Sequence, residues 1–264
     1  MHPIFLHIGN FELASYGLMT ALGYAAAAGY LVTRLKTCGI KGLTQDTLWN
    51  LLFTIFLGAI VGGKLFFILL SWPELGATLA EKITTIIHDI RYGFVFFGGL
   101  LVAVPAALGY MHYKKLPILK TADFLIVAVP LGHALGRIGC FLAGCCYGKP
   151  TTLPWGVTFS DPHALVAPEL MGIPLHPTQL YESLFNFALF GLLHYLSKKP
   201  HKEGKILVVY IWCYALLRFG IEFLRADFRG GFLFGLSPAQ VISLAIATCA
   251  LFIWINYLRG PRHG

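Results

Sequence analysis

Six ionisable side chains lie within or at the edges of long apolar stretches, and they are the first candidates for chemistry. They are Lys64, Asp123, Arg137, Glu182, Arg218 and Glu222. A charged group inside a membrane is costly, so each of them needs a partner or a function. Arg218 and Glu222, four residues apart, are placed to form an ion pair on one helical face. Arginine is permanently charged and its planar guanidinium matches phosphate. Arg137 and Arg218, with Arg225 further along, therefore indicate a site for a phospholipid headgroup.

The segment 132–148 carries the densest set of such residues. It contains five glycines, which allow a ligand or a neighbouring helix to approach the backbone closely. His133 precedes Arg137 by four residues, so a helix here would place both side chains on one face.

Three cysteines follow in the same segment, and several interpretations of them stay open. Cys140, Cys145 and Cys146 are compatible with apolar packing, a local disulfide, a reactive thiol or a metal site. The adjacent pair fits zinc poorly, because zinc usually takes four ligands at wider spacing. Packing or a disulfide is favoured, and a catalytic thiol at Cys145 is the next hypothesis, since the cation of Arg137 would favour a thiolate. We predict no metal and no cofactor.

The elements that must position these residues are membrane-spanning helices. The chain has 264 residues, of which 57% are hydrophobic and 12% charged, about half the charged fraction of a soluble domain. Uncharged stretches of 21, 22 and 29 residues cover 13–33, 92–113 and 230–258, each long enough to cross a bilayer. Four further apolar segments cover about 47–70, 121–143, 178–197 and 206–225. We predict an all-α polytopic membrane protein with about seven transmembrane helices.

The distribution of basic residues predicts the orientation of these helices. With an outside N-terminus, the inside connections hold twelve Lys and Arg residues and the outside connections hold five. Cytoplasmic loops are enriched in Lys and Arg, so the N-terminus is predicted outside and the C-terminus in the cytoplasm. The net charge of +8 is spread over loops rather than gathered on one soluble face, which argues against nucleic-acid binding.

One connection, 144–176, is longer than loops usually are and is rich in Gly and Pro. Such length and composition predict a small irregular head segment outside the membrane, with a function of its own. The whole chain, 1–264, is predicted to form a single transmembrane domain. No internal repeat is apparent, which disfavours a transporter.

Four stretches of the sequence, in order, resemble the prolipoprotein diacylglyceryl transferases of the bacterial cytoplasmic membrane. They are 16–19, 136–139 with Gly148, 176–182 and 214–225. The resemblance implies an enzyme of the bacterial inner membrane that moves a diacylglyceryl group from phosphatidylglycerol to the thiol of a lipobox cysteine. The products are a thioether on the prolipoprotein signal peptide and glycerol phosphate.

The resemblance also implies roles for individual residues. By resemblance, Arg137 and Arg218 bind the phosphate. The predicted catalytic group also includes His133 and Cys145, which are added for their spacing and chemistry and not from the resemblance. The predicted substrate-binding group comprises Tyr16, Lys64, Gly98, Gly99, Gly148, His176, Gln179, Glu182, Tyr214, Glu222 and Arg225.

Three positions depart from the family pattern. Phe97 stands where the family has a histidine that is a candidate base, and Cys140 and Cys145 replace an asparagine and a glutamate. Phenylalanine cannot accept a proton, so His133 is the hypothesised substitute, with His176 as another spare histidine. Packing or hydrogen bonding within the bundle is the competing interpretation of His133. The alternatives to the transferase are a related enzyme with another acceptor and a non-catalytic phospholipid-binding protein.

Overall fold

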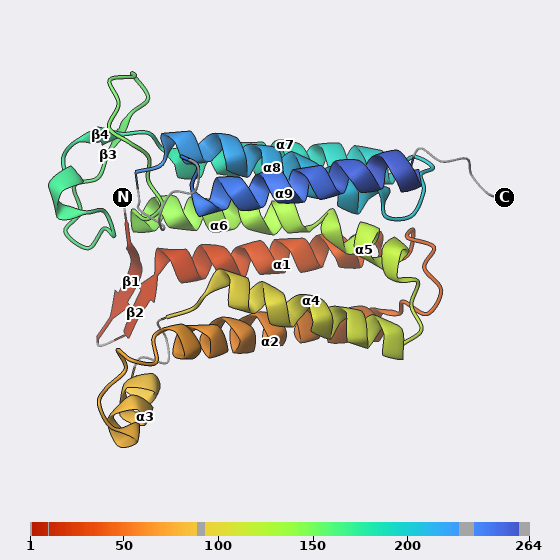
Figure 1. Cartoon of the computed structure of the whole chain (residues 1–264), viewed down its shortest axis with the longest axis horizontal. Helices are drawn as coiled ribbons and strands as arrows, with labels where there is room; N and C mark the ends of the chain where they lie inside the picture. Colours follow the sequence, from red (N-terminus) through yellow and green to blue (C-terminus); the bar gives the residue numbers. More distant parts are fainter. Residues whose placement is uncertain (1, 10, 89–92, 227–234, 259–264) are drawn as a thin grey trace. The chain divides into compact units, whose positions relative to one another are not determined.

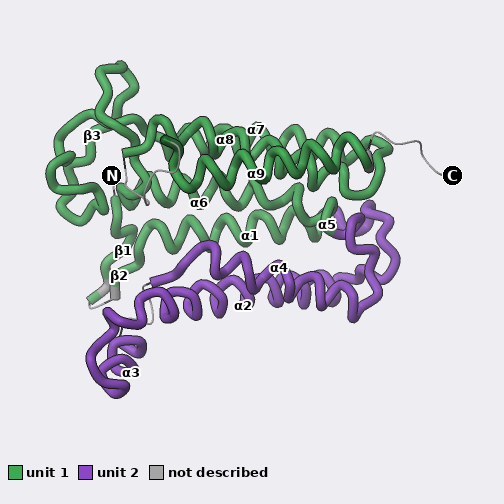
Figure 2. The backbone as a smooth tube through the Cα atoms, in the orientation of Figure 1, with its two compact units in different colours: residues 1–33, 122–264 green, residues 34–121 purple. Residues whose placement is uncertain are grey.

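The computed structural model describes residues 2–9, 11–88, 93–226 and 235–258. Its elements fall into two compact units, residues 1–33 with 122–264 and residues 34–121 (Figure 2). The first unit holds the hairpin β1 (Ile4–Ile8) and β2 (Phe11–Ala14), most of α1 (Ser15–Leu35), α6 (Val129–Ala143), α7 (Thr178–Ser197), α8 (Lys205–Ile221) and α9 (Pro238–Ile253). The second holds α2 (Gln45–Leu70), α3 (Leu79–His88) and α4 (Phe96–Tyr113), while α5 (Ile118–Ile126) crosses the boundary.

Five helical stretches of the described chain are long and apolar enough to cross a membrane. They are Gln45–Leu70, Phe96–Tyr113, Ile118–Ala143, Lys205–Leu224 and Pro238–Asn256. Large hydrophobic side chains on them are exposed rather than packed inside the protein, among them Phe53, Leu70, Leu101 and Phe252. An exposed apolar surface on this scale needs lipid or a partner to cover it. The chain is a mostly helical, multi-pass membrane protein, and its helices are drawn in Figure 1.

The apolar span predicted over 121–143 is present as Ile118–Ala143, but a short turn divides it into α5 and α6. Helix α5 ends at Ile126 and α6 begins at Val129, with Pro130 in its first turn. Proline has no N–H to donate and is accommodated best in the first turn of a helix. The break therefore lies where Pro130 allows a new first turn.

Within the first unit, α6 packs on α7, α7 on α8, and α8 on α9. Four fully or almost fully buried apolar residues from α7, α8 and the α5–α6 link form one core: Val127, Leu189, Leu193 and Ile206. Polar residues of α7 are buried as completely as apolar ones: Gln179, Glu182 and Asn186 are 0% exposed. Buried polar groups need hydrogen-bonding or charged partners, so we expect such partners on the segments that pack against this face of α7.

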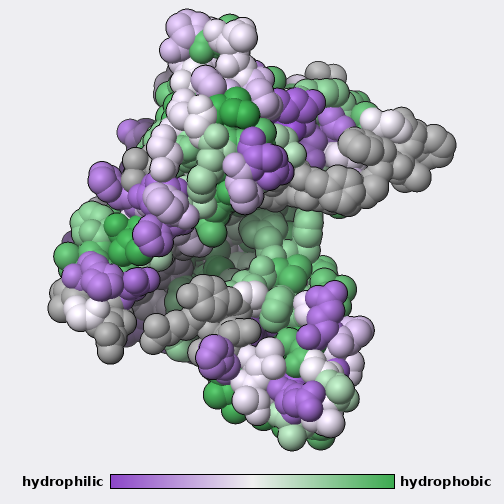
Figure 3. Space-filling view, turned by 90° about the vertical axis from the view of Figure 1, so that its left-hand side faces the viewer, coloured by the Kyte–Doolittle hydropathy of each residue, from purple (hydrophilic) through white to green (hydrophobic). Residues whose placement is uncertain are grey.

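The predicted head segment, 144–176, has more structure than its composition indicated. It contains the short antiparallel pair β3 (Val157–Thr158) and β4 (Pro174–Leu175) and the turn η1 (Pro168–Leu170). Tyr147, Phe159, Val166 and Leu175 form a small core of their own. Figure 3 shows the face of the protein on which this segment lies, and hydrophilic residues are interspersed with hydrophobic ones there.

Glycines bring α2 and α4 into close contact in the second unit. A Cβ at Gly62 would lie 2.4 Å from the Gly98 carbonyl oxygen, and one at Gly99 would lie 2.9 Å from the Ala59 carbonyl oxygen. Small residues at such crossings let two membrane helices pack backbone to backbone. Gly98 and Gly99, predicted to contact substrate, therefore have a packing role in this unit.

Replacement of Gly62 by alanine is expected to lower the apparent unfolding temperature of the protein in detergent. The added methyl group has no room, and overpacking of this kind costs about 1–3 kcal/mol. Gly109→Ala, also in a helix of this unit, is the matched control, because nothing lies within 4 Å of its added Cβ and alanine is the better helix former. Equal unfolding temperatures for both variants would contradict a tight α2–α4 crossing.

Candidate functional site

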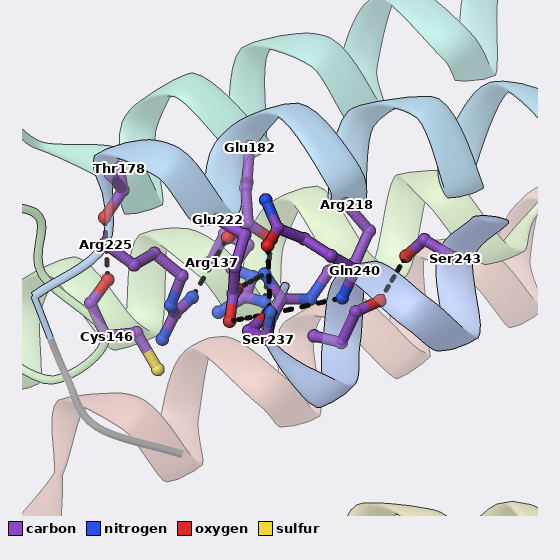
Figure 4. A network of polar contacts seen from close by, with 11 residues as sticks. Arg137, Cys146, Thr178, Glu182, Arg218, Glu222, Arg225, Ser237, Gln240 and Ser243 are labelled. Carbon is purple, nitrogen blue, oxygen red and sulfur yellow. Dashed lines mark hydrogen bonds and ion pairs between the residues drawn. The ribbon is translucent and has the colours of Figure 1, made fainter. Parts of the chain in front are cut away.

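Two arginine side chains from different segments converge on the buried carboxylate of Glu182 on α7 (Figure 4). Arg137 Nη2 of α6 lies 2.7 Å from Glu182 Oε2. Arg225 Nη1, just after the short 3₁₀ helix η2 (Glu222–Leu224), donates to Glu182 Oε1 at 3.3 Å. The side chains of Glu182 and Arg225 are 0% and 2% exposed, so α7 supplies the counter-ion for two arginines from different segments.

A second ion pair lies at the end of α8. Arg218 Nη1 is 2.8 Å from Glu222 Oε2, and the two residues are one helical turn apart. Ser237 Oγ donates to Glu222 Oε1 at 2.9 Å. Ser237 also begins α9 and forms a capping box with Gln240. The start of α9 therefore holds the carboxylate that orients Arg218.

The charges of this cluster do not cancel. Arg137, Arg218 and Arg225 carry three positive charges, against two negative charges on Glu182 and Glu222. Among the described residues, nothing accepts a hydrogen bond from the buried Arg137 Nε. An excess positive charge and an available guanidinium donor in a buried setting favour a phosphate-bearing ligand.

His133 and Tyr214 lie beside the arginine cluster. Their rings, one on α6 and one on α8, have centroids 5.4 Å apart. His133 is half-buried, one helical turn before Arg137 on α6. The structure thus places His133 where the sequence placed it, on the helix of Arg137, with an aromatic hydroxyl from another helix nearby.

Tyr16 lies in the first turn of α1, and the position of Gly139 explains how it comes close to α6. A Cβ at Gly139 would lie 3.3 Å from the Tyr16 Cα and 3.0 Å from the Met19 Cβ. Tyr16 itself is 47% exposed, and its role in binding the headgroup stays a prediction.

The first turn of α7 holds the backbone that follows α6. Gln179 Nε2 donates to the Cys145 carbonyl oxygen and Thr178 Oγ1 to that of Cys146, both at 2.7 Å. Hydrogen bonds with the neighbouring thiols of Cys140 and Cys146 raise the pKa of the Cys145 thiol. Hydrogen bonds from Cys140 and Cys145, with the nearby charge of Arg225, lower the pKa of Cys146. The pKa values of these two adjacent thiols therefore shift in opposite directions, and the catalytic role of Cys145 stays a prediction.

Gly148 lies where the head segment crosses the chain that follows η2. Its N–H donates to the His176 carbonyl oxygen at 2.9 Å, and it forms a β-bridge with Arg225. A Cβ at Gly148 would lie 2.6 Å from the His176 Cβ and 2.7 Å from the Leu224 carbonyl oxygen. Glycine is needed at position 148 because a side chain would collide with the two neighbouring segments. The close crossing that glycine allows fixes the backbone of Arg225.

The ring of His176 belongs to a separate contact with Tyr181. Its Nδ1 lies 3.3 Å from the Tyr181 hydroxyl, which also accepts a hydrogen bond from Trp155 Nε1 at 2.8 Å. Among the described residues, this ring has no recorded contact with the arginine cluster, so His133 is the better placed of the two spare histidines.

Lys64, Gly98 and Gly99 belong to the second unit, together with Phe97. The Lys64 ammonium lies over the rings of Phe67 and Phe94, with the nitrogen 5.1 and 5.6 Å from their centroids. Phe97 is 54% exposed on α4. Within their own unit these residues contact apolar and aromatic groups, and their predicted role in substrate binding stays a prediction.

Some residues of the site have a weaker signal in the sequence. Ser237 and Gln240 follow the capping-box pattern that marks a helix start, but nothing in that pattern indicates the bond from Ser237 to Glu222. Cys146 contacts Arg225 across 79 positions of the chain, which only the folded backbone reveals.

Comparison with known proteins gives a consistent result over almost the entire chain. The sequence model of the family described as prolipoprotein diacylglyceryl transferase matches residues 3–256. A protein of Clostridium tetani named phosphatidylglycerol–prolipoprotein diacylglyceryl transferase is 36% identical over 96% of this chain and 97% of its own. One of Clostridium perfringens, named as the second such transferase, is 34% identical over 99% and 98%. One of Bordetella parapertussis is 31% identical over 98% and 96%. With this extent of similarity, the chain belongs to the prolipoprotein diacylglyceryl transferase family.

Proposed function

We propose that this protein transfers a diacylglyceryl group from phosphatidylglycerol to the thiol of a lipobox cysteine in a prolipoprotein signal peptide. The observation that carries the proposal is the buried cluster of three arginines and two glutamates, with one positive charge in excess. The names of the relatives specify phosphatidylglycerol and prolipoprotein for those proteins.

The proposed reaction is a displacement at the glyceryl carbon that bears the phosphate ester. The acceptor sulfur forms a C–S bond, the C–O bond to phosphate breaks, and glycerol phosphate leaves with the bond electrons. Negative charge grows on the departing phosphate, where fixed cations in a water-poor site stabilise it. Arg137 and Arg218 bind this phosphate. Glu182 and Glu222 hold the two guanidinium groups in position.

The thiol proton must leave as the C–S bond forms, because the thiolate is the nucleophile. Phe97 cannot accept it, and we propose that His133 does. Its position on the helix of Arg137, with its ring beside that of Tyr214, supports this role, because a base must lie close to the groups that bind the reacting lipid. Tyr16 and Tyr214 supply hydroxyl groups for the headgroup, and the head segment 144–176 receives the signal peptide.

His133→Gln is expected to lower the transfer rate by about 10²–10⁴-fold, the usual contribution of a general base. Glutamine keeps the hydrogen-bonding capacity and much of the size but cannot take the proton at neutral pH. His112→Gln, at an exposed position in the last turn of α4, is the matched control and should leave the rate unchanged. A His133→Gln enzyme with wild-type turnover would remove His133 from the mechanism.

We also propose seven membrane spans within one functional domain, 1–264, in the bacterial inner membrane, with the N-terminus outside and the C-terminus in the cytoplasm. Helices α1 and α7, of 21 and 20 residues, are long enough at 1.5 Å per residue to reach across the roughly 30 Å hydrocarbon layer. They add two spans to the five strongly apolar ones. The bias of basic residues supports this orientation. The test fuses the C-terminus to a reporter enzyme that is active only in the periplasm. Activity of this fusion would contradict the proposed orientation.

The decisive experiment incubates the purified protein in detergent with phosphatidylglycerol and a lipobox peptide. A mass increase of the peptide by one diacylglyceryl group, with equal release of glycerol phosphate, is the expected result, and Arg137→Ala is the inactive control. Release of glycerol phosphate without peptide modification would favour another acceptor, the function that the departures at Phe97, Cys140 and Cys145 support. Lipid binding without either product would instead show a non-catalytic protein.

A further inference from the structure

Three thiol groups meet at the end of α6, beside the arginine cluster and outside the proposed reaction. The Sγ atoms of Cys140, Cys145 and Cys146 all lie within 4.8 Å of one another. None of these three cysteines is in a disulfide, and each is buried or half-buried. The sequence disfavoured a metal here because Cys145 and Cys146 are adjacent, and the backbone of the turn removes that objection.

The turn after α6 brings the adjacent cysteines to one point. Gly144 ends the helix in the left-handed conformation with φ +76°, and Cys146 has φ +62°. A non-glycine residue in this region costs about 1 kcal/mol or more and persists only where surrounding contacts impose it. The left-handed Cys146 turns its side chain toward Cys140 and Cys145 instead of away from them.

Those contacts come from the first turn of α7, and they are independent of the thiols. The fully buried side chains of Thr178 and Gln179 hold the carbonyl oxygens of Cys146 and Cys145 at 2.7 Å. The Cys145 N–H donates to the Cys140 carbonyl oxygen at 3.1 Å. The positions of the sulfur ligands are therefore set by the fold before any ion arrives, which lowers the entropic cost of binding.

We propose that Cys140, Cys145 and Cys146 bind one soft, thiophilic metal ion, with Cu(I) as the best match. Sulfur ligands select Cu(I) and zinc over harder cations. Among the described residues, no histidine or carboxylate joins the group, whereas a structural zinc site takes four protein ligands. Three sulfur ligands alone fit Cu(I), which accepts three-coordination. Binding of the ion displaces the protons of the thiols.

The charge around the three thiols suits such a complex. Three thiolates and Cu(I) together carry two negative charges. The Arg225 side chain contacts Cys146, and Arg137 exerts its positive charge on Cys140 and Cys146. Both arginines also pair with Glu182, so the one positive charge in excess in the cluster offsets part of the charge of the complex, which an apolar site would reject.

The test titrates reduced, metal-free, full-length protein in detergent with Cu(I) in competition with a coloured Cu(I) chelator. One equivalent is expected to bind, with thiolate-to-metal charge-transfer absorption and only sulfur neighbours in the X-ray absorption spectrum. Cys140→Ser and Cys145→Ser are each expected to weaken binding at least 100-fold. The triple variant Cys38→Ser, Cys213→Ser, Cys249→Ser changes the other cysteines and should keep full affinity.

Any of several results would overturn the proposal. In the titrations these are no stoichiometric binding of Cu(I) by the wild type, wild-type affinity in Cys145→Ser, or loss of binding in the triple control variant. A disulfide among the three thiols that persists in reductant would do the same, because it would remove the ligands. Tighter binding of Zn²⁺ than of Cu(I) would overturn the assignment of a three-coordinate site. Wild-type unfolding temperatures for the serine variants show that a lost affinity reflects lost ligands rather than lost fold.

Discussion

Arg137→Lys is expected to lower the rate of diacylglyceryl transfer by about 100-fold or more, although the positive charge is kept. Arg137 places one nitrogen on Glu182, 2.7 Å away, while its Nε remains without an acceptor among the described residues. A guanidinium serves the glutamate and a phosphate oxygen at the same time, and a lysine ammonium is too compact to span both. Loss of one preorganised donor to a developing anion costs about 10²–10³ in rate.

The measurement is the initial rate of peptide modification at saturating phosphatidylglycerol. Arg34→Lys, in the last turn of α1, makes the same chemical change away from the cluster and should alter the rate less than about twofold. If Arg137→Lys retained a third of the wild-type rate, the phosphate contact would be purely electrostatic, and the proposed two-sided role of Arg137 would be wrong.

Glu182→Gln is expected to lower the free energy of unfolding by about 3–5 kcal/mol, the cost of removing one partner of a buried ion pair. Glu182 is 0% exposed and faces both Arg137 and Arg225. Glutamine preserves the shape, so the loss isolates the charge. The experiment follows the apparent unfolding temperature in detergent at a fixed heating rate, because unfolding of such proteins is often irreversible.

Two controls define this result. Glu203→Gln, at an exposed position between α7 and α8, should change the unfolding temperature very little. Adding Arg225→Gln to Glu182→Gln should recover part of the loss, because the double variant no longer buries that unpaired cation. A destabilisation that is simply additive would show that Glu182 and Arg225 are not coupled, against the geometry.

Much of the helical framework follows from the sequence. The long uncharged stretches and the apolar segments with few charges correspond to α1, α2, α4, α7, α8 and α9 within a few residues at most ends. Length and hydropathy are sufficient for this, because a membrane helix is selected by its own composition. The hairpin β1–β2 and the amphipathic α3 were not predicted, since short elements lack so strong a signal.

The sequence indicated which residues belong to the site, but it did not indicate which of them pair across different helices. Arg218 with Glu222 was the expected i, i+4 pair and is confirmed at 2.8 Å. The sharing of Glu182 between Arg137 and Arg225 depends on how α6, α7 and the end of α8 pack, and the periodicity of a single helix does not contain that information. The left-handed turn at Cys146 depends likewise on Thr178 of another helix.

The pairing of Arg137 with Glu182 has a consequence for how the protein is made. Glu182 follows Arg137 by 45 residues, about 2–9 s of synthesis at 5–20 residues per second. During that interval α6 carries an arginine without its counter-ion, and an arginine at the centre of a single helix costs about 2.5–3.5 kcal/mol on insertion. We therefore expect α6 to leave the translocon together with α7, as a helical hairpin, and the head segment between them to cross the membrane as part of the same event.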